Sequence, residues 1–206
     1  MKTLTLDSFV DIADVYAGSL RLLPPIAESV ELGNFAKKIV EEAFEALIEE
    51  IDSSHLRSVE LFIKNATHCK STFTNSKTTE DLLRSLISKR YPKVKQGDLL
   101  FDVPRLRIIP NSDIFSSGIS YNYLPHRDTW YGAGHNQVNH WMALSNVTPN
   151  STFYMAPSFF EAQISNSSSE FDLDTWNDVH RPQAGSNVAT ESRQIGRASC
   201  WERVLI

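Results

Sequence analysis

The chain has 206 residues and a formal net charge of −5, with 41% hydrophobic and 22% charged residues. This balance is typical of a soluble domain, and it disfavours nucleic acid and anionic membranes as partners, because both attract clustered Lys and Arg. No apolar run approaches the ~20 residues that cross a bilayer, and acidic residues follow Met1 too soon for a secretory leader. We therefore expect a cytoplasmic protein that binds neither nucleic acid nor membrane.

The first part of the chain, 1–95, is predicted to be mainly helical. Moderate helical periodicity over 9–23 ends at a pair of prolines. From 34 to 51, apolar residues recur at steps of three and four with charged residues between them, which is the pattern of an amphipathic helix. Asn34 follows a glycine and is the expected N-cap of this helix.

A further helix is predicted over 79–90, with a stripe of apolar residues on one side. Thr78 can cap its N-terminus, and Tyr91–Pro92 ends it. The preceding stretch, 55–69, fits either a strand or a helix. Its last residue, Cys69, is predicted to be a buried structural thiol, because the two cysteines of the chain lie too far apart to suggest a disulfide framework.

After Gln96 the pattern changes from helical periodicity to alternation. Polar and apolar side chains alternate with period two in 105–109 and 119–123, and 137–144 and 152–156 are two further predicted strands. Helices followed by strands indicate an α+β fold, in which the helices flank an antiparallel sandwich or barrel. We therefore expect a strand-rich core over 96–194.

The residues that point most directly to chemistry are His126 and Asp128. Residues two apart on a strand project to the same face, so this pair can supply two adjacent metal ligands while Arg127 points away. Two such ligands and a distant histidine make a 2-His-1-carboxylate triad, which leaves metal positions open for a cosubstrate and dioxygen. Alone, the His-x-Asp pattern is weak, because a surface histidine beside a solvated aspartate is the commoner reason for it.

The residues around this pair add a family resemblance. Pro125 to Tyr131 and Gln137 to Trp141 resemble the segment that holds the first two iron ligands in Fe(II)/2-oxoglutarate-dependent dioxygenases of the phytanoyl-CoA dioxygenase-like group, and the similarity covers about 102–184. The resemblance implies a double-stranded β-helix, a cupin-like jelly roll with helices packed on one side. It also implies Fe(II), 2-oxoglutarate and dioxygen, and hydroxylation of a small-molecule substrate, with His126 and Asp128 as the catalytic metal ligands.

Four further residues are candidates for holding the cosubstrate. Tyr121 and Asn139, on strands beside the metal, could form hydrogen bonds to 2-oxoglutarate or to the substrate. Trp130 could form a wall of the pocket, and Arg107 could pair with a carboxylate. The alternatives are core packing for the tryptophan and a solvated strand face for the arginine.

The third metal ligand is harder to place. In the family it is a histidine on a late strand, followed by an arginine that pairs with 2-oxoglutarate. Here His135 lies too close to Asp128 to come from an opposing strand, and His140 alternates with apolar neighbours, which favours packing. His180 stands at a workable distance but in a polar stretch with no trailing arginine strand. We therefore expect the distal histidine beyond Gln194, half an iron site in this chain, and little or no turnover by the chain alone.

The final segment, 195–206, resembles the translation of a short-read sequencing adapter. Ile195 to Cys200 back-translates into adapter DNA, and 202–204 continue it. Such a tail is excluded from reasoning about the fold. We expect the natural domain to continue beyond Gln194 with other residues.

Two other classes of function fit parts of the sequence. A metal-free jelly-roll module could bind a ligand such as a sugar with its strand aromatics, which leaves the His-x-Asp pair incidental. A zinc hydrolase could combine that pair with His135 or His140. The hydrolase is disfavoured, because no His-Glu-x-x-His or similar helix motif supplies ligands and base together.

Overall fold

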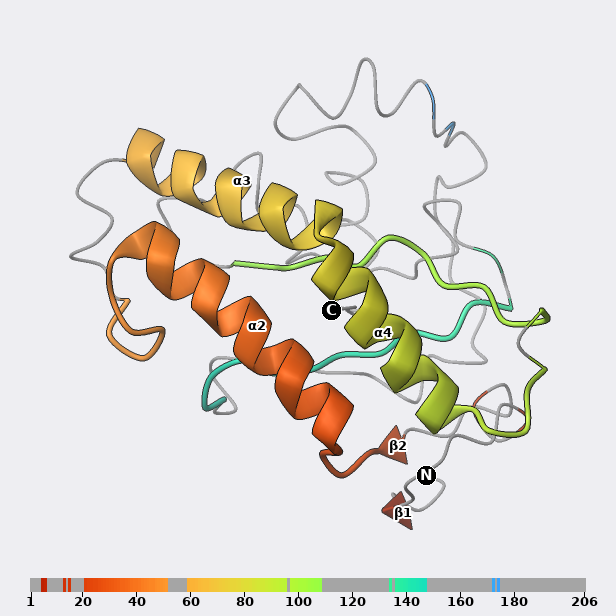
Figure 1. Cartoon of the computed structure of the whole chain (residues 1–206). Coiled ribbons are helices and arrows are strands. Elements are labelled where there is room, and N and C mark those ends of the chain that lie inside the picture. Colours follow the sequence, from red (N-terminus) through yellow and green to blue (C-terminus); the bar gives the residue numbers. More distant parts are fainter. Residues whose placement is uncertain are drawn as a thin grey trace, which may run out of the picture. The chain divides into compact units, whose positions relative to one another are not determined.

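Three helices, α2 (Ala27–Phe44), α3 (Val59–Asn75) and α4 (Lys77–Arg90), make up most of the regular structure described (Figure 1). The computed structural model describes residues 5–6, 13, 15, 21–51, 59–95, 97–108, 134, 136–147, 172 and 174. Two short strands, β1 (Thr5–Leu6) and β2 (Arg21–Leu22), pair in parallel. Over these described ranges, no helix has the length and apolar character needed to cross a membrane.

The chain divides into two units. The first consists of 1–108, 138–147 and 204–206, and the second of 109–137 and 148–203. The helices, both strands and the segments 97–108 and 138–147 belong to the first unit. The predicted strands 119–123 and 152–156 and the adapter-like tail lie outside the described residues.

Helix α2 begins earlier and ends earlier than its apolar pattern predicts. The Ser29 hydroxyl accepts a hydrogen bond from the Ile26 backbone N–H at 2.9 Å and donates one to the Ile26 carbonyl at 2.8 Å, which closes the first turn. Asn34 is therefore an interior residue, and its assignment as the N-cap is wrong. The helix ends at Phe44, because Glu45 takes the left-handed conformation with φ 52°.

The stretch 55–69, which fits either a strand or a helix by sequence, is helical in α3 from Val59 onward, and 55–58 lie outside the described residues. The buried residues of α3 recur at steps of three and four and are Phe62, Ala66, Cys69 and Phe73. Helix α4 confirms the predicted helix over 79–90, although the N-cap position is taken by Ser76 and not by Thr78. Of the predicted helix over 9–23, Ala13 and Val15 are helical and β2 occupies Arg21–Leu22, while 9–12, 14 and 16–20 lie outside the described residues.

The core of the first unit lies where the helices meet. Phe44 and Phe62 pack edge to face with ring centroids 5.6 Å apart, and Leu32 and Phe73 are fully buried. Cys69 is also fully buried, which confirms the predicted structural thiol, and its Sγ lies 3.7 Å from the Ile39 carbonyl oxygen of α2. Burial raises the pKa of this thiol to about 11, so it remains protonated at neutral pH.

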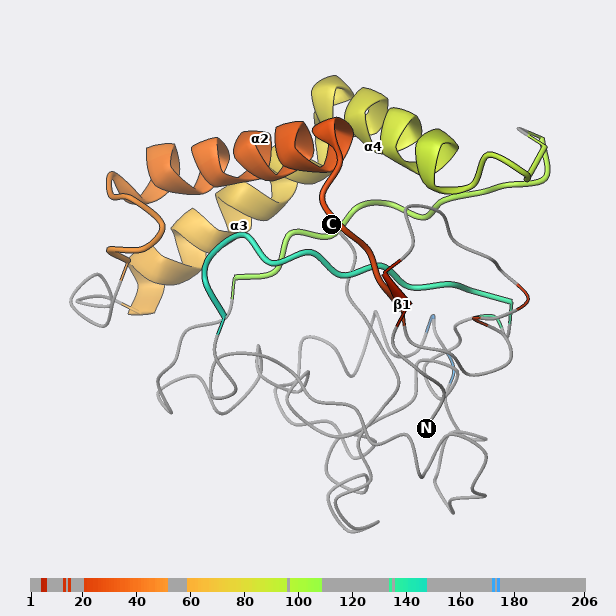
Figure 2. The ribbon, with the colours of Figure 1, turned by 90° about the horizontal axis from the view of Figure 1, so that it is seen from below.

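The segments 97–108 and 138–147 run along the same side of the helices (Figure 2). Thr74 of α3 donates a hydrogen bond to the Pro104 carbonyl at 2.9 Å. Exposed Arg105 stands next to buried Leu106, as the predicted alternation requires, yet neither 105–108 nor 137–144 forms a hydrogen-bonded ladder with described residues. The double-stranded β-helix therefore stays a prediction, because its other expected strands are not described.

Candidate functional site

The expected iron site and the described structure overlap at only a few positions. Outside the described residues lie His126, Asp128, Tyr121, Trp130, His135 and His180. Arg107, Asn139 and His140 are described, and all three are partly buried in the segments beside the helices. The described residues contain no group of three or more His, Cys, Asp or Glu side chains that could hold a metal ion.

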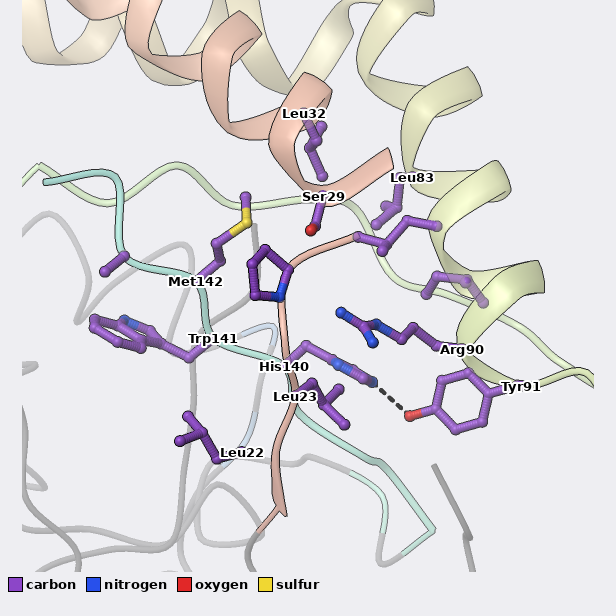
Figure 3. Close-up of a pocket in the computed structure, with 14 residues that line it drawn as sticks. Leu22, Leu23, Ser29, Leu32, Leu83, Arg90, Tyr91, His140, Trp141 and Met142 are labelled. Atoms are coloured by element: carbon purple, nitrogen blue, oxygen red, sulfur yellow. Dashed lines mark hydrogen bonds between the residues drawn. The ribbon is translucent and has the colours of Figure 1, made fainter. Parts of the chain in front are cut away.

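A cavity of about 320 Å³ is present in the first unit, between α2, α4, the β2–α2 connection and the segment 138–147 (Figure 3). We call it the Arg90 cavity. Its lining is mainly aliphatic and aromatic and comprises Leu22, Leu23, Pro25, Ser29, Leu32, Leu83, Leu86, Ile87, Arg90, Tyr91, His140, Trp141, Met142 and Ala143. This volume falls near the lower end of the ~300–1,000 Å³ range of small-molecule sites.

Three elements place the apolar walls of this cavity. Leu83, Leu86 and Ile87 recur at steps of three and four on one face of α4, so the inner stripe predicted for this helix forms one wall. Leu32 comes from the buried face of α2. Met142 reaches the same region from the segment 138–147 (Figure 3).

One end of the cavity carries a histidine paired with a tyrosine. The Tyr91 hydroxyl and His140 Nε2 lie 2.5 Å apart in a hydrogen bond, and their rings meet edge to face at 5.6 Å (Figure 3). Burial, and after it the positive charge of Arg90, lowers the pKa of His140 from 6.5 to about 4. The imidazole is therefore neutral at physiological pH.

Arg90 brings a buried positive charge to the same end. The residue is only 4% exposed, and its guanidinium donates a hydrogen bond to the Pro24 carbonyl at 2.5 Å. Burial lowers the pKa of Arg90, and the negative charge of Glu28 acts in the opposite direction. An arginine side chain nevertheless stays protonated in proteins, so the cavity carries one permanent positive charge.

This donor set suits a small organic molecule and not a metal ion. The described lining includes a single imidazole and no carboxylate, whereas iron and zinc sites combine several such ligands. His140 also has its Nε2 in the hydrogen bond to Tyr91.

Sequence reasoning missed this cavity, although one signal was present. Arg90 follows Leu83 by seven residues, so the helical repeat places the arginine on the same buried face as the apolar stripe. A charged residue at a buried position of an amphipathic helix is uncommon and marks a specific interaction. The segment 138–147, which contains His140, lies far from α4 in the sequence, so no local pattern predicts that the two pack together.

Of the remaining described candidates, Arg107 and Asn139 do not line the Arg90 cavity. Arg105, two residues before Arg107, forms an exposed ion pair with Asp102 at 3.2 Å, as expected of a solvated face. Comparison with models of known protein families, with curated proteins and with solved structures finds no match to this chain.

Proposed function

We propose that this chain carries the first part of the metal site of a non-haem Fe(II)- and 2-oxoglutarate-dependent oxygenase that hydroxylates a small-molecule substrate. The observation that carries the proposal is the His126-Arg127-Asp128 sequence within the pattern that extends to Trp141. An imidazole and a carboxylate two residues apart on a strand can bind one metal ion from one side.

Each candidate residue has a definite role in this proposal. His126 and Asp128 would bind Fe(II), and Arg107 would pair with a carboxylate of 2-oxoglutarate. Tyr121 and Asn139 would form hydrogen bonds to the cosubstrate or substrate, beside a wall formed by Trp130. When bound, iron, 2-oxoglutarate and dioxygen supply the oxidising chemistry, in which one oxygen atom enters the substrate and the other enters succinate as carbon dioxide leaves.

The structure bears on the third ligand through His140. Because its Nε2 contacts the Tyr91 hydroxyl in a cavity without described carboxylates, we do not include His140 among the metal ligands. The same contact weakens the zinc hydrolase that would use this residue. His180 remains a candidate for the third ligand.

The test is the visible spectrum of the full chain with Fe(II) and 2-oxoglutarate in the absence of oxygen. Chelation of iron by 2-oxoglutarate should give a weak charge-transfer band, which neither a zinc hydrolase nor a metal-free module would show. We expect His126→Ala and Asp128→Ala to abolish the band and His68→Ala, which removes an exposed histidine of α3, to leave it intact. A band that survives both ligand substitutions would contradict the proposal.

A metal-free binding module is the second candidate function. The Arg90 cavity favours it, because small-molecule sites are mostly apolar with a few placed polar groups. Absence of the band in the wild-type chain, together with saturable binding of an organic ligand, would support the module over the oxygenase. If the wild-type chain shows the band and His180→Ala loses it, His180 is identified as the third ligand.

A further inference from the structure

The Arg90 cavity has apolar walls from its buried side to its exposed side. Beside the two helices, Leu32 of α2 and Leu83 of α4 are 0% and 4% exposed (Figure 3). Two other lining residues, Leu22 and Trp141, are large and apolar and yet 55% and 40% exposed. The cavity is therefore closed toward the helices and reaches solvent beside Leu22 and Trp141. A hydrocarbon group in it would remove apolar surface from water.

Four polar side chains line the cavity, and each already has a partner within the protein. The Ser29 hydroxyl forms its two hydrogen bonds inside the first turn of α2. Arg90 donates to the Pro24 carbonyl, and the Tyr91 hydroxyl shares a hydrogen bond with His140. A polar ligand would have to compete with these contacts, whereas a hydrocarbon would leave them intact. The polar lining therefore favours a ligand that needs no hydrogen bond.

The permanent charge of Arg90 disfavours charged ligands of either sign. A cation would be repelled by the guanidinium. An anion would have to give up its water shell and compete with the Pro24 carbonyl, and the negative charge of Glu28 already acts on the same guanidinium. A neutral molecule avoids both costs.

We infer that the Arg90 cavity binds a neutral, hydrocarbon-like small molecule that lies along the apolar face of α4. The volume of about 320 Å³ is within the range of small-molecule sites, and the leucine side chains of the walls supply affinity through apolar burial. The cavity shares no lining residue with the proposed iron site, so this inference stands apart from the proposed function.

The experiment is calorimetric titration of the full chain, without added metal, with toluene, ethylbenzene and propylbenzene. We expect one molecule to bind per chain. Each added methylene should tighten binding about fourfold, which is the gain in affinity expected from burying one CH₂ group. Affinity that does not rise along the series would overturn the inference.

A charged probe of the same shape tests the neutrality of the ligand. 4-Propylbenzoate adds a carboxylate to propylbenzene and should bind more weakly by about tenfold or more, because the anion loses its water shell. Equal or tighter binding of 4-propylbenzoate would overturn the assignment of a neutral ligand.

Paired tryptophan substitutions locate the binding. Leu86→Trp in α4 and Ala143→Trp in the segment 138–147 place a large ring at lining positions and should abolish propylbenzene binding. Ser85→Trp and Ser145→Trp, at exposed positions nearby in the sequence that do not line the cavity, should leave it unchanged. Ala143 is itself exposed, so its variant should fold even if Leu86→Trp does not. Propylbenzene binding that survives Ala143→Trp would overturn the inference.

Discussion

The unusual environment of His140 makes stability depend on pH in a way that can be calculated. The folded protein holds the imidazole neutral with a pKa of about 4, whereas an unfolded chain protonates it near pH 6.5. The unfolded state therefore binds more protons between these values. The contribution of His140 is fully present above pH 6.5 and is lost as the pH falls toward 4.

The size of this contribution follows from the two pKa values. Lowering the pKa from 6.5 to about 4 is worth about 3 kcal/mol of unfolding free energy over the whole range. About 2 kcal/mol of this falls between pH 7 and pH 5. Replacing His140 with glutamine keeps a hydrogen-bonding side chain for Tyr91 but removes the titrating group. Between pH 7 and pH 5 the unfolding free energy of the variant should therefore fall by about 2 kcal/mol less than that of the wild type.

Urea unfolding at pH 7 and at pH 5, followed by circular dichroism, measures this difference. The comparison between variants cancels the carboxylates that also titrate in this interval. His68→Gln, a substitution of the same kind at an exposed position of α3, should retain the full loss of the wild type. If His140→Gln and the wild type lose the same unfolding free energy, the buried neutral imidazole is refuted.

Two further substitutions and one thiol-labelling reaction test the structure of α2 and α3. Gly33→Ala should raise the unfolding free energy, measured in urea, by about 0.5–1 kcal/mol, because Gly33 lies inside α2, where alanine is the better helix former. The added Cβ would meet Met142 at an ordinary contact distance of 3.5 Å. A lower unfolding free energy would show that the helix needs the glycine. Glu45→Gly should raise the melting temperature by relieving about 1 kcal/mol of strain at φ 52°, and an unchanged or lower value would count against that backbone conformation. In a Cys200→Ser background, Cys69 should resist Ellman's reagent in the folded chain and react once the chain is unfolded. The reason is that the thiol is fully buried and its pKa is raised to about 11. Rapid labelling of the folded chain would contradict this burial.

The helices could be predicted from the sequence where the pattern is local. The amphipathic repeat finds α2 and α4, but it places the start of α2 at Asn34, because the closing hydrogen bonds of Ser29 to Ile26 leave little trace in hydrophobicity. Helix α3 stayed undecided because a window ending at Cys69 omits Phe73, the buried residue that completes its stripe.

The two candidate sites differ in what local pattern can reveal. The proposed pair of His126 and Asp128 can be recognised from local spacing alone, because strand geometry would place residues two apart on one face, whereas a third ligand would depend on the pairing of distant strands. The Arg90 cavity depends on the contact between Tyr91 and His140, which brings together residues 49 apart in the chain. Helical periodicity indicates the buried face of α4 but not what packs against it.

We propose that His126 and Asp128 bind iron, and anomalous scattering is the direct test of this binding. Crystals of the full chain grown without oxygen in the presence of Fe(II) and 2-oxoglutarate would be measured at the iron absorption edge. We expect one anomalous peak between the His126 imidazole and the Asp128 carboxylate, and we expect it to be absent in crystals of Asp128→Ala. Iron bound at other residues only, or a peak that persists in that variant, would contradict it.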